Sequence, residues 1–161
     1  RLPIDPAWTA WTLAKKLDRP SLSLLREVVK AHAEGRPPPA TPQDATQATE
    51  APEPTDDDLE IRWNELAEGV VRRVRAASPW PGAFTEIAGQ TVAITRAEAT
   101  TDFPRALEPS EAAVVGDAVV VRAKDTAVRL LEGRLEGTIE RDLARADFVR
   151  LVRGDSSRID A

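Results

Sequence analysis

The chain has 161 residues, of which 42% are apolar and 30% charged, with a formal net charge of −5 at pH 7. That length suits one ordinary domain with attachments, and no apolar run approaches the roughly 18 residues of a membrane span. With no cysteine and a single histidine, disulfides, cysteine nucleophiles, and thiolate or multi-histidine metal sites are excluded. Because methionine is absent even from position 1 and no signal-peptide pattern is present, we expect a soluble, intracellular, non-catalytic piece of a longer chain.

Charge is spread over the chain rather than concentrated in one half. Residues 1–58 carry 7 Lys and Arg against 10 Asp and Glu, and residues 59–161 carry 15 against 17. Neither half has the basic excess that is typical of a dedicated nucleic-acid-binding domain. Any contact with RNA would therefore depend on a local cluster of basic residues.

The first segment has apolar residues at helical spacing. The pattern is interrupted where Pro20 disfavours helical geometry for the residue before it and Ser21 offers a helix cap. We therefore expect a helical hairpin over residues 7–17 and 21–34, ended by Gly35.

A Pro-rich segment follows at residues 37–57. It contains six of the thirteen prolines and no Leu, Ile, Val or Phe, so it cannot bury enough surface to offset its ordering entropy. We predict an interdomain linker, with Asp56, Asp57 and Asp58 as solvated linker acid rather than a cation site. His32 is expected to be an exposed imidazole near a helix end.

From Leu59 the pattern becomes globular. A helix is predicted from an N-cap at Asn64 to Ala77, followed by short segments with the period-two alternation of strands. Hairpin spacing of five or six short strands favours a small antiparallel barrel or sandwich. The predicted strands are 83–87, 91–99, 111–115, 118–123 and 126–131, and a final helix is expected over about 142–152.

Three motifs in this globular part carry a family resemblance. They are Ile61-Arg62-Trp63-Asn64, Arg72-Arg73-Val74-Arg75-Ala76 and Pro79-Trp80-Pro81-Gly82-Ala83-Phe84. Their order and spacing resemble the start of the C-terminal domain in the methionyl-tRNA formyltransferase family. Departures are Arg62 for the family's Asp, Leu66 for a Pro, Leu143 for a Ser or Thr, and a shortened segment at 100–110.

The resemblance covers nearly the whole chain and implies its organisation. Residues 1–36 would be the helical tail of a formyltransferase catalytic domain, 37–57 the linker, 58–155 an OB-like C-terminal domain and 156–161 a disordered tail. The predicted fold is therefore mainly β: a small OB-like antiparallel barrel flanked by helices, preceded by the helical hairpin and the Pro-rich linker.

The family's catalytic Asn, His and Asp and its folate-binding loops belong to an N-terminal domain, and no stretch of this chain matches them. The resemblance thus implies no catalytic, cofactor-binding or metal-binding residue here. It implies a parent formyltransferase that uses 10-formyltetrahydrofolate, has its catalytic domain upstream, and acts in the cytoplasm in translation initiation.

The candidate RNA-binding residues are Arg72, Arg73, Arg75 and Lys124. Planar guanidinium groups suit phosphate, and the resemblance implies that this domain holds tRNA weakly, through backbone contacts. The alternative interpretation is a solvated helix face that pairs with nearby glutamates, and the sequence leaves both open.

The tryptophans are expected in packed positions. Trp8 and Trp11 are interpreted as core contacts to a partner outside this chain. We expect Trp80 to fill the seam between helix and barrel, held by Pro79 and Pro81, with stacking on a base as the alternative.

Two hypotheses follow for the function. The first is the C-terminal domain of a 10-formyltetrahydrofolate-dependent formyltransferase that positions tRNA and does not catalyse the transfer. The second is a structural or protein-docking module of a related or fusion enzyme with a non-tRNA acceptor, which the near-neutral barrel and the shortened segment 100–110 favour.

Overall fold

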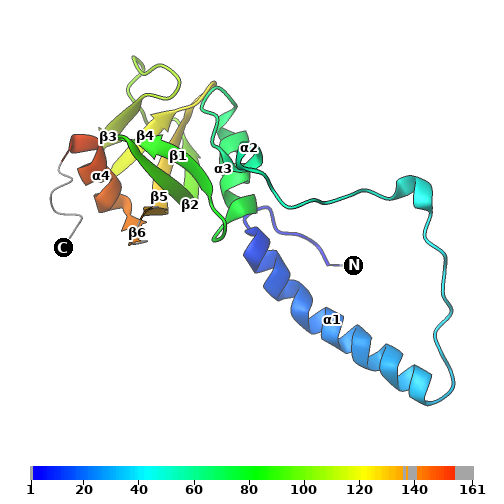
Figure 1. The fold of residues 1–161 in the computed structure, drawn as a ribbon. Coiled ribbons are helices and arrows are strands. Elements are labelled where there is room, and N and C mark those ends of the chain that lie inside the picture. The colour runs from blue at the N-terminus through cyan, green and yellow to red at the C-terminus, as the bar shows by residue number, and fades with distance from the viewer. Residues whose placement is uncertain (1, 136, 138–140, 155–161) are drawn as a thin grey trace. The chain divides into compact units, whose positions relative to one another are not determined.

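The computed structural model describes residues 2–135, 137 and 141–154 (Figure 1). The chain divides into two compact units, Arg1–Pro54 and Thr55–Ala161. Within the described residues, no helix combines the length and the apolar character that crossing a membrane requires. The predicted tail at residues 156–161 lies outside the described residues.

The first unit contains one long helix, α1 (Ala10–Ala33). The Thr9 hydroxyl caps it by accepting a hydrogen bond from the N–H of Thr12 at 3.1 Å. The predicted helical hairpin is wrong, because the helix continues through Pro20. Pro20 removes one backbone hydrogen bond, but the Ala, Leu, Lys, Arg and Glu residues on both sides favour the helical conformation.

The Pro-rich segment holds little regular structure. It includes one short turn, η1 (Ala45–Gln47), and α2 (Asp56–Leu59) begins at its end. The Asp58 carboxylate accepts hydrogen bonds from the N–H and the hydroxyl of Thr55, at 2.9 and 2.8 Å. These bonds, the backbone one first, lower the pKa of Asp58 below its usual value. The acidic run is therefore part of a capped helical turn.

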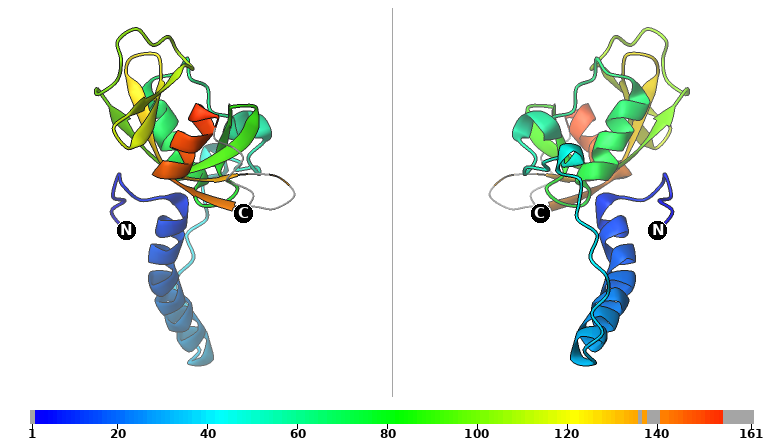
Figure 2. Two further views of the ribbon diagram at one scale, coloured as in Figure 1. Left: turned by 90° about the vertical axis from the view of Figure 1, so that its left-hand side faces the viewer. Right: turned by 90° about the vertical axis from the view of Figure 1, so that its right-hand side faces the viewer.

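The second unit is built on one six-stranded antiparallel sheet with the order β1-β2-β5-β4-β3, in which β6 also pairs with β5 (Figure 2). One edge of β5 pairs with β2, while the other pairs first with β4 and then with β6. The strands are β1 (Ala83–Ile87), β2 (Gln90–Thr100), β3 (Ala112–Val115), β4 (Ala118–Arg122), β5 (Ala127–Leu135) and β6 (Arg141–Ala144).

The five predicted strands are confirmed, but the closing helix begins later than predicted. The first residues of the predicted helix form β6, and α4 (Arg145–Arg153) follows. Leu143 pairs with Gly133 of β5 and is buried. The helix begins where the Asp147 carboxylate accepts a hydrogen bond from the N–H of Ala144 at 2.9 Å.

The helix with the candidate arginines, α3 (Ala67–Ala77), ends as predicted but is not capped by Asn64. Leu66 is its N-cap residue and offers no side-chain acceptor. Instead, Asp125 Oδ1, in the turn between β4 and β5, accepts a hydrogen bond from the N–H of Ala67 at 2.8 Å. This bond is the main cause that lowers the pKa of Asp125 below its usual value.

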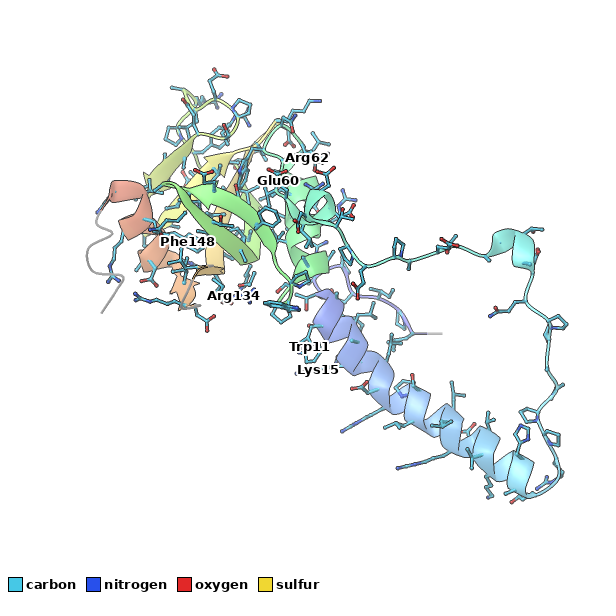
Figure 3. The ribbon with its side chains drawn as sticks, viewed as in Figure 1. Trp11, Lys15, Glu60, Arg62, Arg134 and Phe148 are labelled. Atoms are coloured by element: carbon cyan, nitrogen blue, oxygen red, sulfur yellow. The ribbon has the colours of Figure 1, made fainter. Side chains whose placement is uncertain are left out.

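One core joins the helices to the sheet. α3 packs mainly on β2, and α4 packs on β4 and β6. Phe148 of α4 is fully buried and crosses β5 at Gly133, where a Cβ would lie 2.7 Å from the ring (Figure 3). The predicted mainly β fold with flanking helices is confirmed, and it is consistent with an OB-like barrel.

Candidate nucleic-acid interface

The arginines of α3 differ in how freely they face solvent. The Arg73 side chain is only 21% exposed. Its Nη1 donates to the carbonyl of Glu60 at 2.9 Å, and its Nη2 donates to Glu65 Oε1 at 3.0 Å. Arg73 therefore fastens α3 to the segment that precedes it, and both of its terminal nitrogens already donate to that segment.

Arg72 and Arg75 are held more loosely. Both approach the carboxylate of Glu68, Arg72 Nε at 3.7 Å and Arg75 Nη1 at 3.9 Å from Glu68 Oε1. The Arg72 side chain is 66% exposed, whereas that of Arg75 is only 26% exposed. An exposed ion pair such as that of Arg72 with Glu68 contributes about 0–1 kcal/mol to stability. A phosphate with better geometry can therefore replace Glu68 at little cost.

Lys124 lies beside the start of α3. It is exposed, and its backbone N–H donates to the carbonyl of Glu65 at 2.9 Å. The same Glu65 binds Arg73 through its side chain, so the fold brings Lys124 and α3 together from distant parts of the chain. The structure is compatible with both interpretations. Basic residues come together here as an RNA-binding cluster would require, but glutamates partly neutralise them as on a solvated helix face.

The other basic residues of the sheet are internally paired. Arg129 lies 3.2 Å from Glu98 and 3.3 Å from Asp102. Arg122 donates to the carbonyl of Thr126 at 2.6 Å, and its guanidinium lies 4.9 Å from the centroid of the Phe103 ring. This face of the sheet therefore offers few donors to a ligand.

Trp80 does not fill the seam between helix and barrel, because its residue surface is 69% exposed. The guanidinium of Arg134 lies 4.8 Å from the Trp80 ring centroid and donates to the carbonyl of Pro81 at 3.0 Å. Figure 3 labels Arg134 at this end of the sheet. The Trp80 ring is thus held in position by Arg134 and remains exposed, which is compatible with the alternative that it stacks on a base.

A second basic cluster, which the sequence analysis overlooked, lies on α1. Lys15, Lys16 and Arg19 fall within its first turns, next to Trp11. The charge count over residues 1–58 concealed it, because the acidic linker outweighs it. A count over the helix alone would have found it.

No metal site is present among the described residues, since none of their His, Asp and Glu side chains form groups of three that could hold an ion. Asp57 pairs with Arg62 at 3.3 Å, and Asp58 is used by Thr55. His32 is exposed in the last turn of α1, as predicted.

Comparison with protein families identifies the sheet-containing unit. Residues 54–146 match the model described as formyl transferase, C-terminal domain. The chain belongs to the formyl transferase family. The resemblance inferred from the motifs around Trp63 and Trp80 is therefore confirmed.

Formyltransferase relatives match almost the whole chain. The methionyl-tRNA formyltransferase of Koribacter versatilis is 34% identical over 157 residues, which are 97% of this chain and 48% of the relative. That of Sorangium cellulosum is 32% identical over 151 residues, 92% of this chain and 48% of the relative. The chain spans about half the length of these curated relatives.

Solved structures share the fold of this formyltransferase domain. A variant of HypX from Aquifex aeolicus aligns with a TM-score of 0.73 at 21% identity, covering 92% of this chain and 28% of HypX. HypX in complex with tetrahydrofolic acid aligns with a TM-score of 0.67 at 21% identity, covering 83% and 23%. At this identity the likeness concerns the fold.

One concavity of the second unit is small for a folate cofactor. This concavity, between Trp63, Thr85 and Val152, has a volume of about 230 Å³, below the roughly 300–1,000 Å³ of typical ligand pockets. The Thr85 hydroxyl in this concavity already has a hydrogen-bond partner, because Trp63 Nε1 donates to Thr85 Oγ1 at 3.0 Å. We therefore assign no part of folate chemistry to this concavity.

Proposed function

We propose that this chain is the C-terminal half of a 10-formyltetrahydrofolate-dependent formyltransferase, and that it positions the tRNA acceptor without catalysing the transfer. The observation that supports this most strongly is the 97% coverage of the chain by a methionyl-tRNA formyltransferase at 34% identity. In this proposal the folate and the catalytic residues belong to an upstream catalytic domain.

The proposed RNA contacts are Arg72, Arg73, Arg75 and Lys124. Arg72, Arg75 and Lys124 can reach phosphate directly, because they are exposed or only weakly paired. Arg73 supports them by holding α3 in place. With so few contacts on a unit of negative net charge, the expected Kd for tRNA is about 10⁻⁴–10⁻⁶ M, and it should not depend on sequence.

The proposal is tested by titrating the chain into fluorescently labelled tRNA and recording anisotropy at several salt concentrations. The test variant is R72Q/R75Q/K124Q, which removes three charges but keeps Arg73. The control variant, R96Q/R105Q/R153Q, removes three exposed charges from β2, the following loop and α4. Weaker binding by the test variant alone supports the proposal, whereas equal binding by both variants and the parent contradicts the proposed contacts.

A second function is favoured by a different observation. Glu68 of α3 and Glu65 just before it pair with Arg72, Arg73 and Arg75, so these arginines are partly neutralised within the domain. HypX shares the fold at low identity. The barrel would then be a structural or docking module of a related formyltransferase with a non-tRNA acceptor. A parent chain that fails to bind tRNA even at low salt would favour this function.

A further inference from the structure

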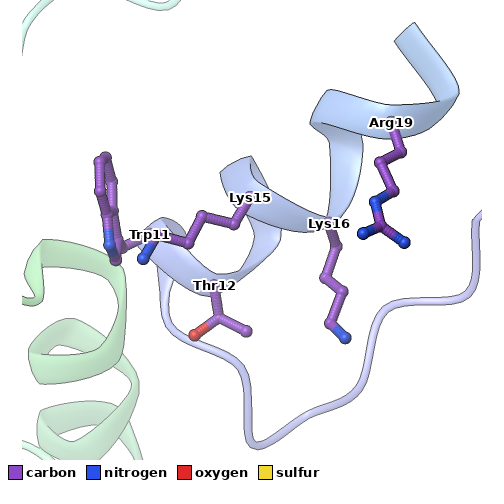
Figure 4. A pocket seen from close by; sticks show the side chains of 5 residues that line it. All are labelled: Trp11, Thr12, Lys15, Lys16 and Arg19. Carbon is purple, nitrogen blue, oxygen red and sulfur yellow. The ribbon is translucent and has the colours of Figure 1, made fainter. Parts of the chain in front are cut away.

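The N-terminal half of α1 presents a concave basic surface. Its lining consists of Trp11, Thr12, Lys15, Lys16 and Arg19, around a volume of about 590 Å³ (Figure 4). Figure 4 shows the Lys15 side chain reaching toward Trp11, while the side chains of Lys16 and Arg19 extend together in another direction from the same helix. We call these five residues the α1 basic surface.

The described residues show no ion pair within 4 Å for Lys15, Lys16 or Arg19, although Asp18 is the neighbour of Arg19 in the sequence. Among the described residues, every ion pair of the first unit involves Glu34, near the other end of α1. No acidic residue lies in the first turn of α1, where the aligned peptide dipoles already give the helix end a positive charge. The arginines of α3 differ, because each of them lies within 4 Å of a glutamate.

Aromatic rings hold two of these cations in place. Lys15 Nζ lies 5.1 Å from the centroid of the Trp11 ring, and Lys16 Nζ lies 5.7 Å from that of Trp8. Cation–π contacts of this length restrict an ammonium group without neutralising its charge. Trp11, which was expected to be a core contact to a partner outside this chain, is 54% exposed, so part of its ring is accessible beside the cations.

We infer that Lys15, Lys16 and Arg19 bind the phosphate backbone of the RNA. The inference rests on the proposed function for the choice of RNA. Unpaired cations next to an exposed indole suit a strand that offers both phosphates and bases. They add a contact on the first unit to the contacts proposed on α3.

An anionic membrane is the other polyanion that this surface could meet, and the charge pattern disfavours it. Helices that lie on membranes are rich in Lys and Arg on their polar face. On α1 the basic excess lies at one end, where Lys15, Lys16 and Arg19 have only Asp18 beside them, while Glu27 and Glu34 balance Arg26 and Lys30 at the other end.

The test compares two variants of the full chain in the tRNA anisotropy assay. The first is K15Q/K16Q/R19Q, and its control is R26Q/K30Q/R36Q, which removes the same charge from the same unit. Gln has nearly the helix propensity of Lys and Arg, so α1 should persist, as circular dichroism would verify. Losing three phosphate contacts should make the slope of log K against log salt less negative by about 2–3. At low salt we expect at least about tenfold weaker binding for the first variant and near-parental binding for the control.

Each other outcome overturns the inference in a distinguishable way. If K15Q/K16Q/R19Q binds as the parent does while R72Q/R75Q/K124Q binds weakly, the proposed function stands and the α1 basic surface is not part of it. Equal losses in the first variant and its control would show a mere net-charge effect. If K15Q/K16Q/R19Q loses binding to phosphatidylserine vesicles but binds tRNA as the parent does, the surface is a membrane contact. A parent chain that binds no tRNA overturns both proposals.

Discussion

Gly133 is the position at which the sheet depends most on the absence of a side chain, so we predict that Gly133→Ala is strongly destabilising. A Cβ there would lie 2.7 Å from the backbone oxygen of Ala93 and 2.7 Å from Cζ of Phe148. The oxygen belongs to β2, which pairs with β5, and the ring is fully buried, so neither can withdraw freely.

The expected magnitude follows from two opposing effects. Overfilling a packed core typically costs about 1–3 kcal/mol, while replacing Gly by Ala restrains the unfolded chain and returns about 0.4–1 kcal/mol. We expect Gly133→Ala to lower the free energy of unfolding by about 1–2 kcal/mol, which corresponds to a melting temperature roughly 5–15 °C lower in a domain of this size.

Urea and thermal unfolding, followed by circular dichroism, measure the effect. Gly69→Ala in α3 is the matched control, because its Cβ would meet only Glu65 Oε2 at 3.8 Å. There the same substitution should raise stability by up to about 1 kcal/mol through helix propensity. The reasoning is refuted if Gly133→Ala is as stable as the parent, or if the two variants shift stability in the same direction.

Three further predictions concern contacts that join distant segments. Asp125→Ala should cost about 1 kcal/mol at pH 7, because Asp125 caps α3. Since folding lowers the pKa of Asp125, this contribution is complete above the unfolded pKa of about 3.9 and is lost as pH falls through the folded pKa. Urea unfolding at pH 7 and pH 2 should show the variant's deficit shrinking at pH 2, and a constant deficit would argue against the cap. Arg73→Gln should cost about 1–2 kcal/mol in the same assay and Arg72→Gln less than about 0.5; equal costs would contradict the fastening role of Arg73. Trp63→Phe should cost about 1–2 kcal/mol, because it leaves the buried Thr85 hydroxyl without its donor, and an unchanged unfolding midpoint would oppose this.

The strands were predicted well because the alternation and turn residues that mark a strand lie within a few neighbouring positions. β1 (Ala83–Ile87) matches its predicted bounds, since alternating burial and the following turn at Gly89 lie within a few residues of one another. The stretch at Leu143 suits either a helix or a strand, and only pairing with β5 decides it. The predicted helical hairpin was wrong because Pro20 was given more weight than the helix-favouring residues on both sides of it.

The candidate site was less predictable, for physical reasons. The cap of α3 comes from Asp125, 58 residues away from Ala67, so no local pattern announces it. Whether an arginine of α3 stabilises the fold through hydrogen bonds or faces solvent depends on where Glu60 and Glu65 lie in space. Likewise, no local pattern shows that β5 brings Arg134 to the exposed Trp80 ring.

We propose above that this chain holds tRNA for a formyltransferase whose catalytic residues lie in another domain. The most direct test of this proposal is a fusion in which the chain replaces the matched half of the Koribacter versatilis methionyl-tRNA formyltransferase. The measured quantity is kcat/KM for formylation of methionyl-tRNA, with the truncated relative and the isolated chain as controls. We expect the isolated chain to form no product and the fusion to have a higher kcat/KM than the truncated relative, by a margin that shrinks between about 50 and 200 mM salt. A folded fusion that is no faster than the truncated relative, or turnover by the isolated chain, would contradict the proposal.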